Sequence, residues 1–302
     1  MKKERSVLEC LGRASGIAVI LALAGCAATT KAPRAAEGPA APAPPAGLIL
    51  EYKMPAGQVL RYSQTDEVKE TSDVMGQIFE SVMTGAGTDS FRSKGRKDGH
   101  YLLEVTIEDM SLSRTSPQGD FKPDLTPVVG KSFDMVLSAL GAEIDVSGAE
   151  PITFTTPSGT RSVASGYKIF FPDLPGKPVK IGDAWPTDTT VEDKAGPLVM
   201  RQEIQRVNTL EGFETVEGMD CVRVVSKLTG RVSGTGSQQG AEIRIEGEIK
   251  GTVVWHFAPK EGIYVQSTSD VVNELTVTVN RGQTMTIPTA QKQTTRVKLA
   301  GR

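Results

Sequence analysis

The sequence has few of the residues on which metal-binding and acid–base chemistry commonly depend. Its 302 residues include 2 histidines and 3 cysteines, which argues against a histidine-rich metal site or a histidine relay. The net charge of −2 is too close to neutral for a protein that binds nucleic acid by neutralising phosphates. Aromatic residues make up only 5% of the chain, so Val, Ile and Leu must supply most of the apolar side chains.

The patterns of common catalytic sites are also absent or incomplete. No HExxH or GxSxG occurs, and the glycines of residues 234–240 do not form the GxGxxG pattern. Ser165 and Lys168 have SxxK spacing, but neither SDN nor KTG accompanies them. His100 and His256 share no ligand spacing, and each is expected to be a strand histidine. An acidic segment lacks the spacing of a calcium loop and is expected to be a solvated hairpin: Glu211, Glu214, Glu217 and Asp220. We therefore expect no catalytic residue, no metal site, no cofactor and no enzymatic activity.

The N-terminus has the pattern of a secretory signal. Four basic residues, Lys2, Lys3, Arg5 and Arg13, precede the uncharged and mostly apolar run from Ala14 to Ala24. This run is too short for a membrane span, which needs about 20 apolar residues. Residues 1–25 are therefore predicted to be a signal peptide.

The apolar run ends in Leu23-Ala24-Gly25-Cys26. This resembles the lipobox of bacterial lipoproteins, in which the signal is cut just before an acylated cysteine. The resemblance implies lipid attachment at Cys26 and a membrane partner reached through acyl chains. The residue after the cysteine is Ala27 rather than Asp, which by the same resemblance implies the outer membrane, facing the periplasm. The inner membrane and the cell surface stay open as alternatives.

Residues 26–47 are rich in Ala and Pro and cannot build a core. They predict a linker between the lipid anchor and the folded body, at most about 65 Å long at roughly 3.1 Å per residue. Once residues 1–25 are removed and Cys26 is acylated, Cys221 is alone. No disulfide can then form within the mature chain, and Cys221 is expected to be a small residue in a strand, with no assigned role.

From Leu48 onward apolar residues recur with a period of two, which predicts a mainly β fold of long antiparallel meander strands. The clearest strand runs from Glu242 to Phe257, with its odd-numbered side chains predicted to be buried and its even-numbered ones, including His256, in water. Turns are expected at Lys97-Asp98-Gly99, Gly182-Asp183, Lys260-Glu261-Gly262 and Asn280-Arg281-Gly282.

Residues 74–85 have two possible interpretations. Val74, Ile78, Phe79, Val82 and Met83 have helical spacing, but the same segment also fits a hairpin that turns at Gly76-Gln77. The hairpin is favoured because Gly282-Gln283 offers the same turn in the last hairpin.

A weak internal repeat suggests two related curved-sheet or half-barrel units. Residues 57–62 are similar to residues 182–187, and residues 131–147 to residues 250–267, at nearly constant offset. The predicted organisation is a first β unit with its connector at 48–175 and a second at 176–302. Chance similarity between amphipathic strands is the alternative.

The connector carries a second resemblance. The phrase from Phe171 to Trp185, FPDLPGKPVKIGDAW, is similar to one in uncharacterised bacterial envelope lipoproteins. Residues 215–224 are similar to a hairpin in the second half of those proteins. Such proteins resemble LolA/LolB-type carriers, in which a curved antiparallel sheet holds acyl chains on its concave face. This implies no ligand residues for the present chain, and Trp185 is expected to be a core residue.

Two function classes follow from these patterns. The first is a non-enzymatic, lipid-anchored lipoprotein that binds a lipid or other apolar ligand on a curved sheet. The second is a structural or interaction lipoprotein without a ligand cavity, with protein partners that the sequence does not identify. A hydrolase assembled from residues that are distant in sequence is the third and least favoured hypothesis.

Overall fold

The computed structural model describes residues 47–238 and 240–302, and these form one antiparallel sheet of thirteen strands. The mainly β prediction is confirmed. The signal peptide, Cys26 and residues 26–46 of the linker lie outside the described residues. Among the described residues, no helix is long and apolar enough to cross a membrane.

The strands are mostly long, as their period-two pattern predicts. Their bounds are β1 (Val59–Val74), β2 (Gln77–Lys97), β3 (His100–Thr115), β4 (Ser132–Leu137), β5 (Glu143–Asp145), β6 (Thr153–Thr156), β7 (Gly159–Ser162), β8 (Ala184–Ala195), β9 (Leu198–Val216), β10 (Met219–Gln238), β11 (Ala241–Ala258), β12 (Ile263–Asn280) and β13 (Thr284–Gly301). The described residues also contain two short helices, the 3-10 helix η1 (Ser147–Ala149) and α2 (Ala164–Tyr167).

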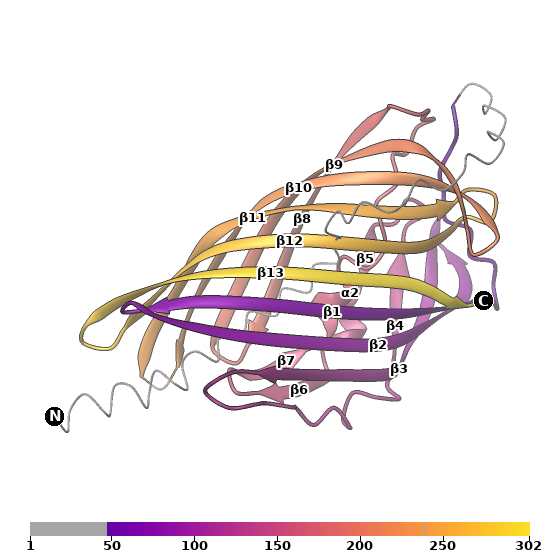
Figure 1. The fold of residues 1–302 in the computed structure, drawn as a ribbon. Coiled ribbons are helices and arrows are strands. Elements are labelled where there is room, and N and C mark those ends of the chain that lie inside the picture. Colours follow the sequence, from indigo (N-terminus) through magenta and orange to yellow (C-terminus); the bar gives the residue numbers. More distant parts are fainter. Residues whose placement is uncertain (1–46, 239) are drawn as a thin grey trace.

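The sheet consists of two meanders, β1–β5 and β6–β13. They are joined by pairing between β1 and β13, the first and last strands in the sequence. The strand order is β5-β4-β3-β2-β1-β13-β12-β11-β10-β9-β8-β7-β6, so the edge strands β5 and β6 are neighbours in sequence. The sheet curls into a half-barrel, with α2 seen behind the strands β12, β13 and β1 (Figure 1). Because β1 pairs with β13 along twelve residues, hydrogen bonding is continuous between the two meanders. The expected division into two related units is therefore not confirmed.

The hairpin interpretation of residues 74–85 is correct, with a shift of one residue. β1 and β2 pair from Val59 to Val74, and the turn falls at Met75-Gly76 instead of Gly76-Gln77. Met75 and Gly76 both have positive φ, 55° and 84°, which is the backbone that a two-residue hairpin turn needs. The Asp73 carboxylate accepts a 2.8 Å hydrogen bond from the Gly76 amide and stabilises the turn.

The predicted alternation of β11 is confirmed, with one exception. Its odd-numbered apolar side chains are buried, including Trp255 at 2% exposed and Phe257 at 0%. His256 was expected in water but is only 6% exposed. A bulge between His256 and Phe257 disturbs the register there, and the imidazole Nε2 lies 2.9 Å from Glu214 Oε2. The prediction for His256 was wrong because the acidic hairpin packs over this end of the strand.

The inner face of the sheet is apolar at both ends and polar between them. At one end, aromatic rings from the strands enclose the segment that follows α2: Phe170 lies 4.7 Å from Phe91 and 5.4 Å from Tyr62 between ring centroids. Trp185 is buried, as expected, and lies edge-on to Trp255. This cluster contains most of the aromatic side chains of the core, which explains how a chain with few aromatics fills one end of a wide sheet.

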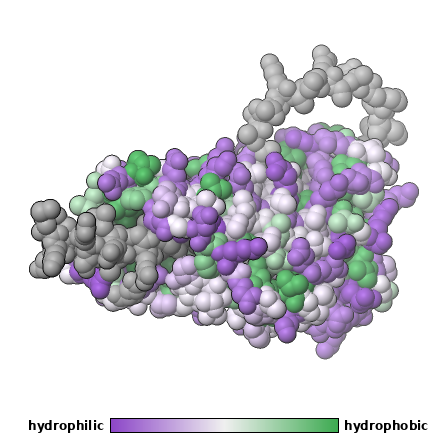
Figure 2. Space-filling model, turned by 60° about the horizontal axis from the view of Figure 1, so that its bottom comes forward, coloured by the Kyte–Doolittle hydropathy of each residue, from purple (hydrophilic) through white to green (hydrophobic). Residues whose placement is uncertain are grey.

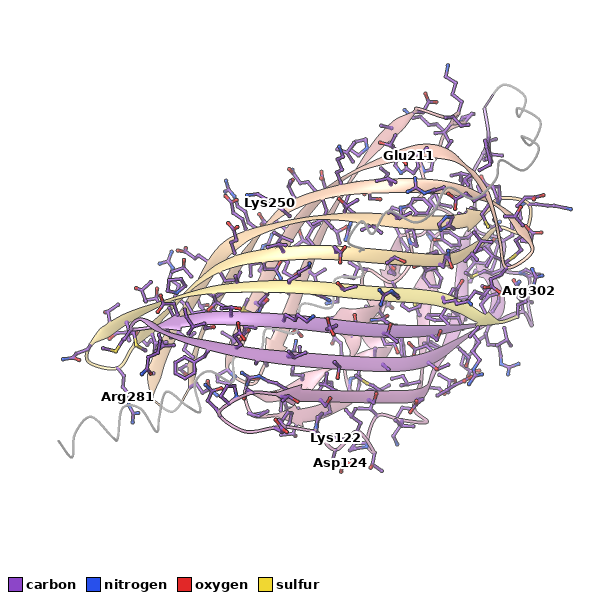
Figure 3. The ribbon with its side chains drawn as sticks, viewed as in Figure 1. Lys122, Asp124, Glu211, Lys250, Arg281 and Arg302 are labelled. Carbon is purple, nitrogen blue, oxygen red and sulfur yellow. The ribbon has the colours of Figure 1, made fainter. Side chains whose placement is uncertain are left out.

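The outer face is charged. On β11, outward side chains alternate with the buried ones and form ion pairs along the strand, such as Lys250 with Glu248 at 2.8 Å. Lys250 and Glu211 project away from the sheet, while Arg281 and Arg302 mark its opposite ends (Figure 3). The surface in Figure 2 is largely hydrophilic, with scattered hydrophobic residues.

Candidate ligand-binding cavities

Among the described residues, two cavities inside the curled sheet flank α2 and the residues that follow it. The first, here called the β2–β3 cavity, has a volume of about 170 Å³. Apolar side chains line much of it, and they come from β1, β2, β3, β6 and the α2 segment: Val68, Met83, Ile107, Met110, Leu112, Phe154, Val163 and Phe170. An apolar cavity of about 150 Å³ accommodates a benzene ring, so this one has room for a small apolar group or the end of an acyl chain.

Glycines on β2 leave this space open. Gly85 and Gly87 occupy inward positions where the strand would otherwise place side chains in the cavity. A Cβ added at Gly85 would have no neighbour closer than 3.6 Å, and neither glycine has a positive φ. Backbone geometry therefore does not require glycine at position 85. The lack of a side chain at this position leaves volume in the cavity.

Buried carboxyls form the polar part of the same cavity. Asp89 accepts a 2.8 Å hydrogen bond from the Tyr167 hydroxyl. Burial raises the pKa of Asp89 to about 7, and the nearby Glu108 adds to the effect, while the Tyr167 hydrogen bond opposes it. Burial also raises the pKa of Asp66, although Thr295 and Gln64 donate hydrogen bonds to it.

A layer of amides and hydroxyls extends this polar surface across β12 and β13. Gln291 donates a 2.8 Å hydrogen bond to Glu70 and accepts one of 3.3 Å from Asn273. Burial raises the pKa of Glu70, while the Arg114 guanidinium and the Gln291 hydrogen bond lower it. Buried polar groups in such a network stabilise the fold only when they are hydrogen-bonded to one another. The network marks the part of the inner face that is polar.

The second cavity, here called the Arg206 cavity, has a volume of about 510 Å³. Strands β5, β8, β9, β10, β11 and β12 and the segment after α2 all contribute to its lining. Arg206 of β9 reaches into it and donates a 2.9 Å hydrogen bond to the Thr189 hydroxyl. Burial lowers the pKa of Arg206, whereas the negative potentials of Asp173 and Glu143 raise it.

Two carboxyls of this cavity, those of Glu143 and Asp173, have raised pKa values. Burial brings the pKa of Glu143 to about 8, against the opposing effects of a 2.8 Å hydrogen bond from the Phe171 amide and of the Arg206 charge. Burial also raises the pKa of Asp173, and the positive charge of Arg206 partly offsets this rise. At neutral pH Glu143 is therefore largely protonated, and the cavity contains the Arg206 cation and the Asp173 carboxyl.

The structure separates the residues that the sequence placed in a possible SxxK site. Ser165 lines the β2–β3 cavity and Lys168 lines the Arg206 cavity, so the two do not form one site. Cys221 is fully buried in β10, and burial raises the pKa of its thiol to about 11, which disfavours the reactive thiolate.

The acidic hairpin is part of the outer surface, as expected. Glu211 and Glu214 pair with Arg223, and Glu217 with Lys298. Within residues 47–238 and 240–302, no group of three or more His, Cys, Asp or Glu side chains could hold a metal ion.

The polar residues of both cavities could not be identified from the sequence. Asp89, Glu143 and Arg206 each occupy a strand position whose neighbours give no sign of a site. A partial signal exists on β13, where Thr289, Gln291, Gln293 and Thr295 interrupt the apolar, odd-numbered face. Four consecutive inward polar residues indicate a buried polar layer, but not what they face.

No family model and no curated protein matches the chain. Among solved structures it is similar to an outer membrane channel from Pseudomonas putida F1, at 9% identity over 82% of this chain and 97% of that one, with a TM-score of 0.25. OccK5 (OpdH) of Pseudomonas aeruginosa matches at 6% identity over 82% and 99% of the two chains, with a TM-score of 0.25. OmpT, an outer membrane protein of Vibrio cholerae, matches at 10% identity over 82% and 98%, with a TM-score of 0.16. We draw no functional conclusion from TM-scores this low.

Proposed function

We propose that this protein is a non-enzymatic, lipid-anchored envelope lipoprotein that binds a lipid or other apolar ligand in the β2–β3 cavity. The observation that supports ligand binding most directly is that cavity, which the inward position 85 leaves open even though a Cβ there would have no neighbour closer than 3.6 Å. The lipobox ending at Cys26 supports the anchor.

The charges on the outer face support a body that stands in water beside the membrane. A lipid-facing sheet carries an apolar band on its outward positions. Here the outward positions of β11 include Glu242, Arg244, Glu246, Glu248 and Lys250, all of them exposed. Burying such a row of charges in hydrocarbon would cost several kcal/mol or more. Anchoring would then depend on the acyl chains at Cys26, and the linker predicted at residues 26–47 would hold the body away from the membrane surface.

The location we propose is the outer membrane, with the body facing the periplasm. Ala27 after the acylated cysteine supports this location, and the inner membrane and the cell surface are the alternatives to be tested. Fractionation of the native host, with immunodetection of the protein in separated membranes and protease accessibility in intact cells, distinguishes the three.

Binding of a fluorescent fatty acid tests the ligand site. Wild-type protein should bind the probe saturably, and Gly85→Leu should weaken binding at least about tenfold, because the added side chain occupies the cavity. Thr84→Leu is the matched control, since Thr84 is the preceding residue of β2, is exposed on the outer face and does not line the cavity. Wild-type affinity in Gly85→Leu, with the fold confirmed by circular dichroism, would show that the probe does not bind there.

The alternative function is a structural or interaction lipoprotein with no ligand. It predicts no saturable binding of fatty acid or phospholipid probes, and no co-purifying lipid when the protein is isolated from its native host and analysed by mass spectrometry. That result would replace the binding proposal and leave the lipid anchor untouched.

A further inference from the structure

Arg206 is a half-buried cation that forms no ion pair with the described residues. Its guanidinium has five N–H donors, and one hydrogen bond, to Thr189, engages it among the described residues. No carboxylate of those residues forms a salt bridge with it. A desolvated charge is costly unless it is paired and hydrogen-bonded, so the remaining donors, which no described residue engages, are available to a ligand that enters the cavity.

Two carboxyls face Arg206 within the same cavity. The side chain of Asp173 accepts no hydrogen bond from another described residue, and the Glu143 carboxyl accepts only from backbone amides, those of Phe171 and of Glu143 itself. Both lie close enough to Arg206 for their potentials to act on it, yet neither contacts it. The groups of opposite charge are thus held apart across the space that all three line.

Part of the polar wall is hydrogen-bonded internally. The Trp255 indole N–H donates a 2.8 Å hydrogen bond to Ser226, whose hydroxyl donates one of 2.5 Å to Asn208. The Asn208 amide in turn donates to the Thr187 hydroxyl at 3.1 Å. These hydrogen bonds fix this wall of the cavity, whereas Arg206, Glu143 and Asp173 keep unused bonding capacity.

We propose that the Arg206 cavity binds a small zwitterionic molecule, whose acidic group pairs with Arg206 and whose ammonium group pairs with Glu143 and Asp173. A purely anionic ligand would face Asp173, and a purely cationic ligand would face Arg206, so either would meet a like charge. A molecule with both groups can pair with Arg206 and with the two carboxyls at the same time. The cavity volume of about 510 Å³ is ample for an amino acid or a dipeptide. Other charged residues of the lining, Asp145, Glu150 and Asp188, are exposed and solvated, and Lys168 is half-buried.

This site is separate from the β2–β3 cavity and requires neither that cavity nor the lipid anchor. Its ligand also differs, because charge rather than apolar area selects it. An ammonium group beside Glu143 favours the ionised carboxylate, so binding near pH 7 should release a proton from this residue.

The test is isothermal titration calorimetry of the purified full chain with glycine, alanyl-alanine and phosphoethanolamine as zwitterionic probes. Propionate and propylamine are the single-charge controls. At least one zwitterion should bind saturably, and at least about tenfold more tightly than either control. Titration in two buffers of different ionisation enthalpy should show proton release. Saturable binding by none of the three zwitterions, or equal binding of propionate, would overturn the proposal, and neither result requires a variant that folds.

Variants then locate the site. Arg206→Gln should weaken binding of the zwitterion at least about tenfold, whereas Arg201→Gln, on the outward face of the same strand, should bind as wild type does. Glu143→Gln should bind more weakly and abolish the proton release. Wild-type affinity in a folded Arg206→Gln protein would show that the zwitterion binds elsewhere.

Discussion

The Tyr167 hydroxyl donates a 2.8 Å hydrogen bond to Asp89, and this contact joins α2 to β2 inside the curled sheet. A four-residue helix has no stability of its own, so α2 depends on such contacts and on the packing of Tyr167 against Phe133, at 4.8 Å between ring centroids. Because α2 and the residues after it separate the two cavities, the Tyr167–Asp89 contact also helps to shape both.

Replacing Asp89 should change the pH dependence of stability. The pKa of Asp89 rises on folding to about 7, so its contribution is fully present at low pH and is lost as the pH rises toward 7. Asp89→Asn keeps an acceptor for the Tyr167 hydroxyl and cannot ionise. Above pH 7 the variant should therefore be more stable than wild type, by up to about 4 kcal/mol.

Urea unfolding at pH 4, 6 and 8 measures this difference. Three other carboxyls with raised pKa values are present in both proteins: Asp66, Glu70 and Glu143. The difference in the free energy of unfolding between wild type and variant therefore reports on Asp89. Parallel stability curves over this pH range would mean that Asp89 is ionised at little cost in the folded protein.

Asp193 should be important for holding the β6–β7 hairpin to the rest of the sheet. The register between β7 and β8 contains one residue pair, Arg161 with Ala195, and the buried ion pair of Arg161 with Asp193 adds to it. Asp193→Ala leaves the Arg161 cation without this partner and should lower the free energy of unfolding by about 3–5 kcal/mol.

Glu192 is the matched control for that substitution. It is the adjacent residue of β8, faces outward, and forms an exposed pair with Arg201 at 3.3 Å. Glu192→Ala should change stability by less than about 1 kcal/mol, as is usual for exposed ion pairs. If both variants have the same denaturation midpoint, the Arg161–Asp193 pair contributes no more than a surface contact does.

The inner and outer faces of β11 should differ sharply in their tolerance of truncation. Trp255→Ala empties a position that is 2% exposed and removes the indole hydrogen bond to Ser226, and it should cost about 3–5 kcal/mol. Lys250→Ala, on the outer face of the same strand, should stay within about 0.5 kcal/mol. Chemical denaturation of both variants gives the comparison, and similar losses for the two would contradict the assignment of faces.

Cys26 should be the acylated N-terminus of the mature protein. Mass spectrometry of the N-terminal peptide should find acyl mass on Cys26, and Cys26→Ser should move the protein from the membrane to the soluble fraction. Each buried methylene contributes about 0.8 kcal/mol to membrane binding, and a body with a charged outer face provides no substitute for those chains. An unmodified N-terminus at any other residue would contradict this prediction.

The strands and their faces could be predicted from the sequence because both depend on local order. A period of two places Ile243, Ile245 and Trp255 on one face whatever the neighbouring strand is. Turns such as Gly182-Asp183 and Lys260-Glu261-Gly262 were found for the same reason, since glycine supplies a backbone conformation that few residues adopt. The turn of the hairpin at residues 75–76 was predicted one position too late, at Gly76-Gln77. Either pair of adjacent residues could form a two-residue turn there.

The lipobox is likewise a local pattern, and Cys26 follows from the sequence alone as a prediction. The cavities do not. Which long strands pair is decided by hydrogen bonds that most antiparallel strands could form with one another, so the pairing of β1 with β13 has no signature in either segment. The curl that this pairing completes brings Glu143, Asp173 and Arg206 together from β5, the segment after α2 and β9, and it alone turns three unremarkable charged residues into one candidate site.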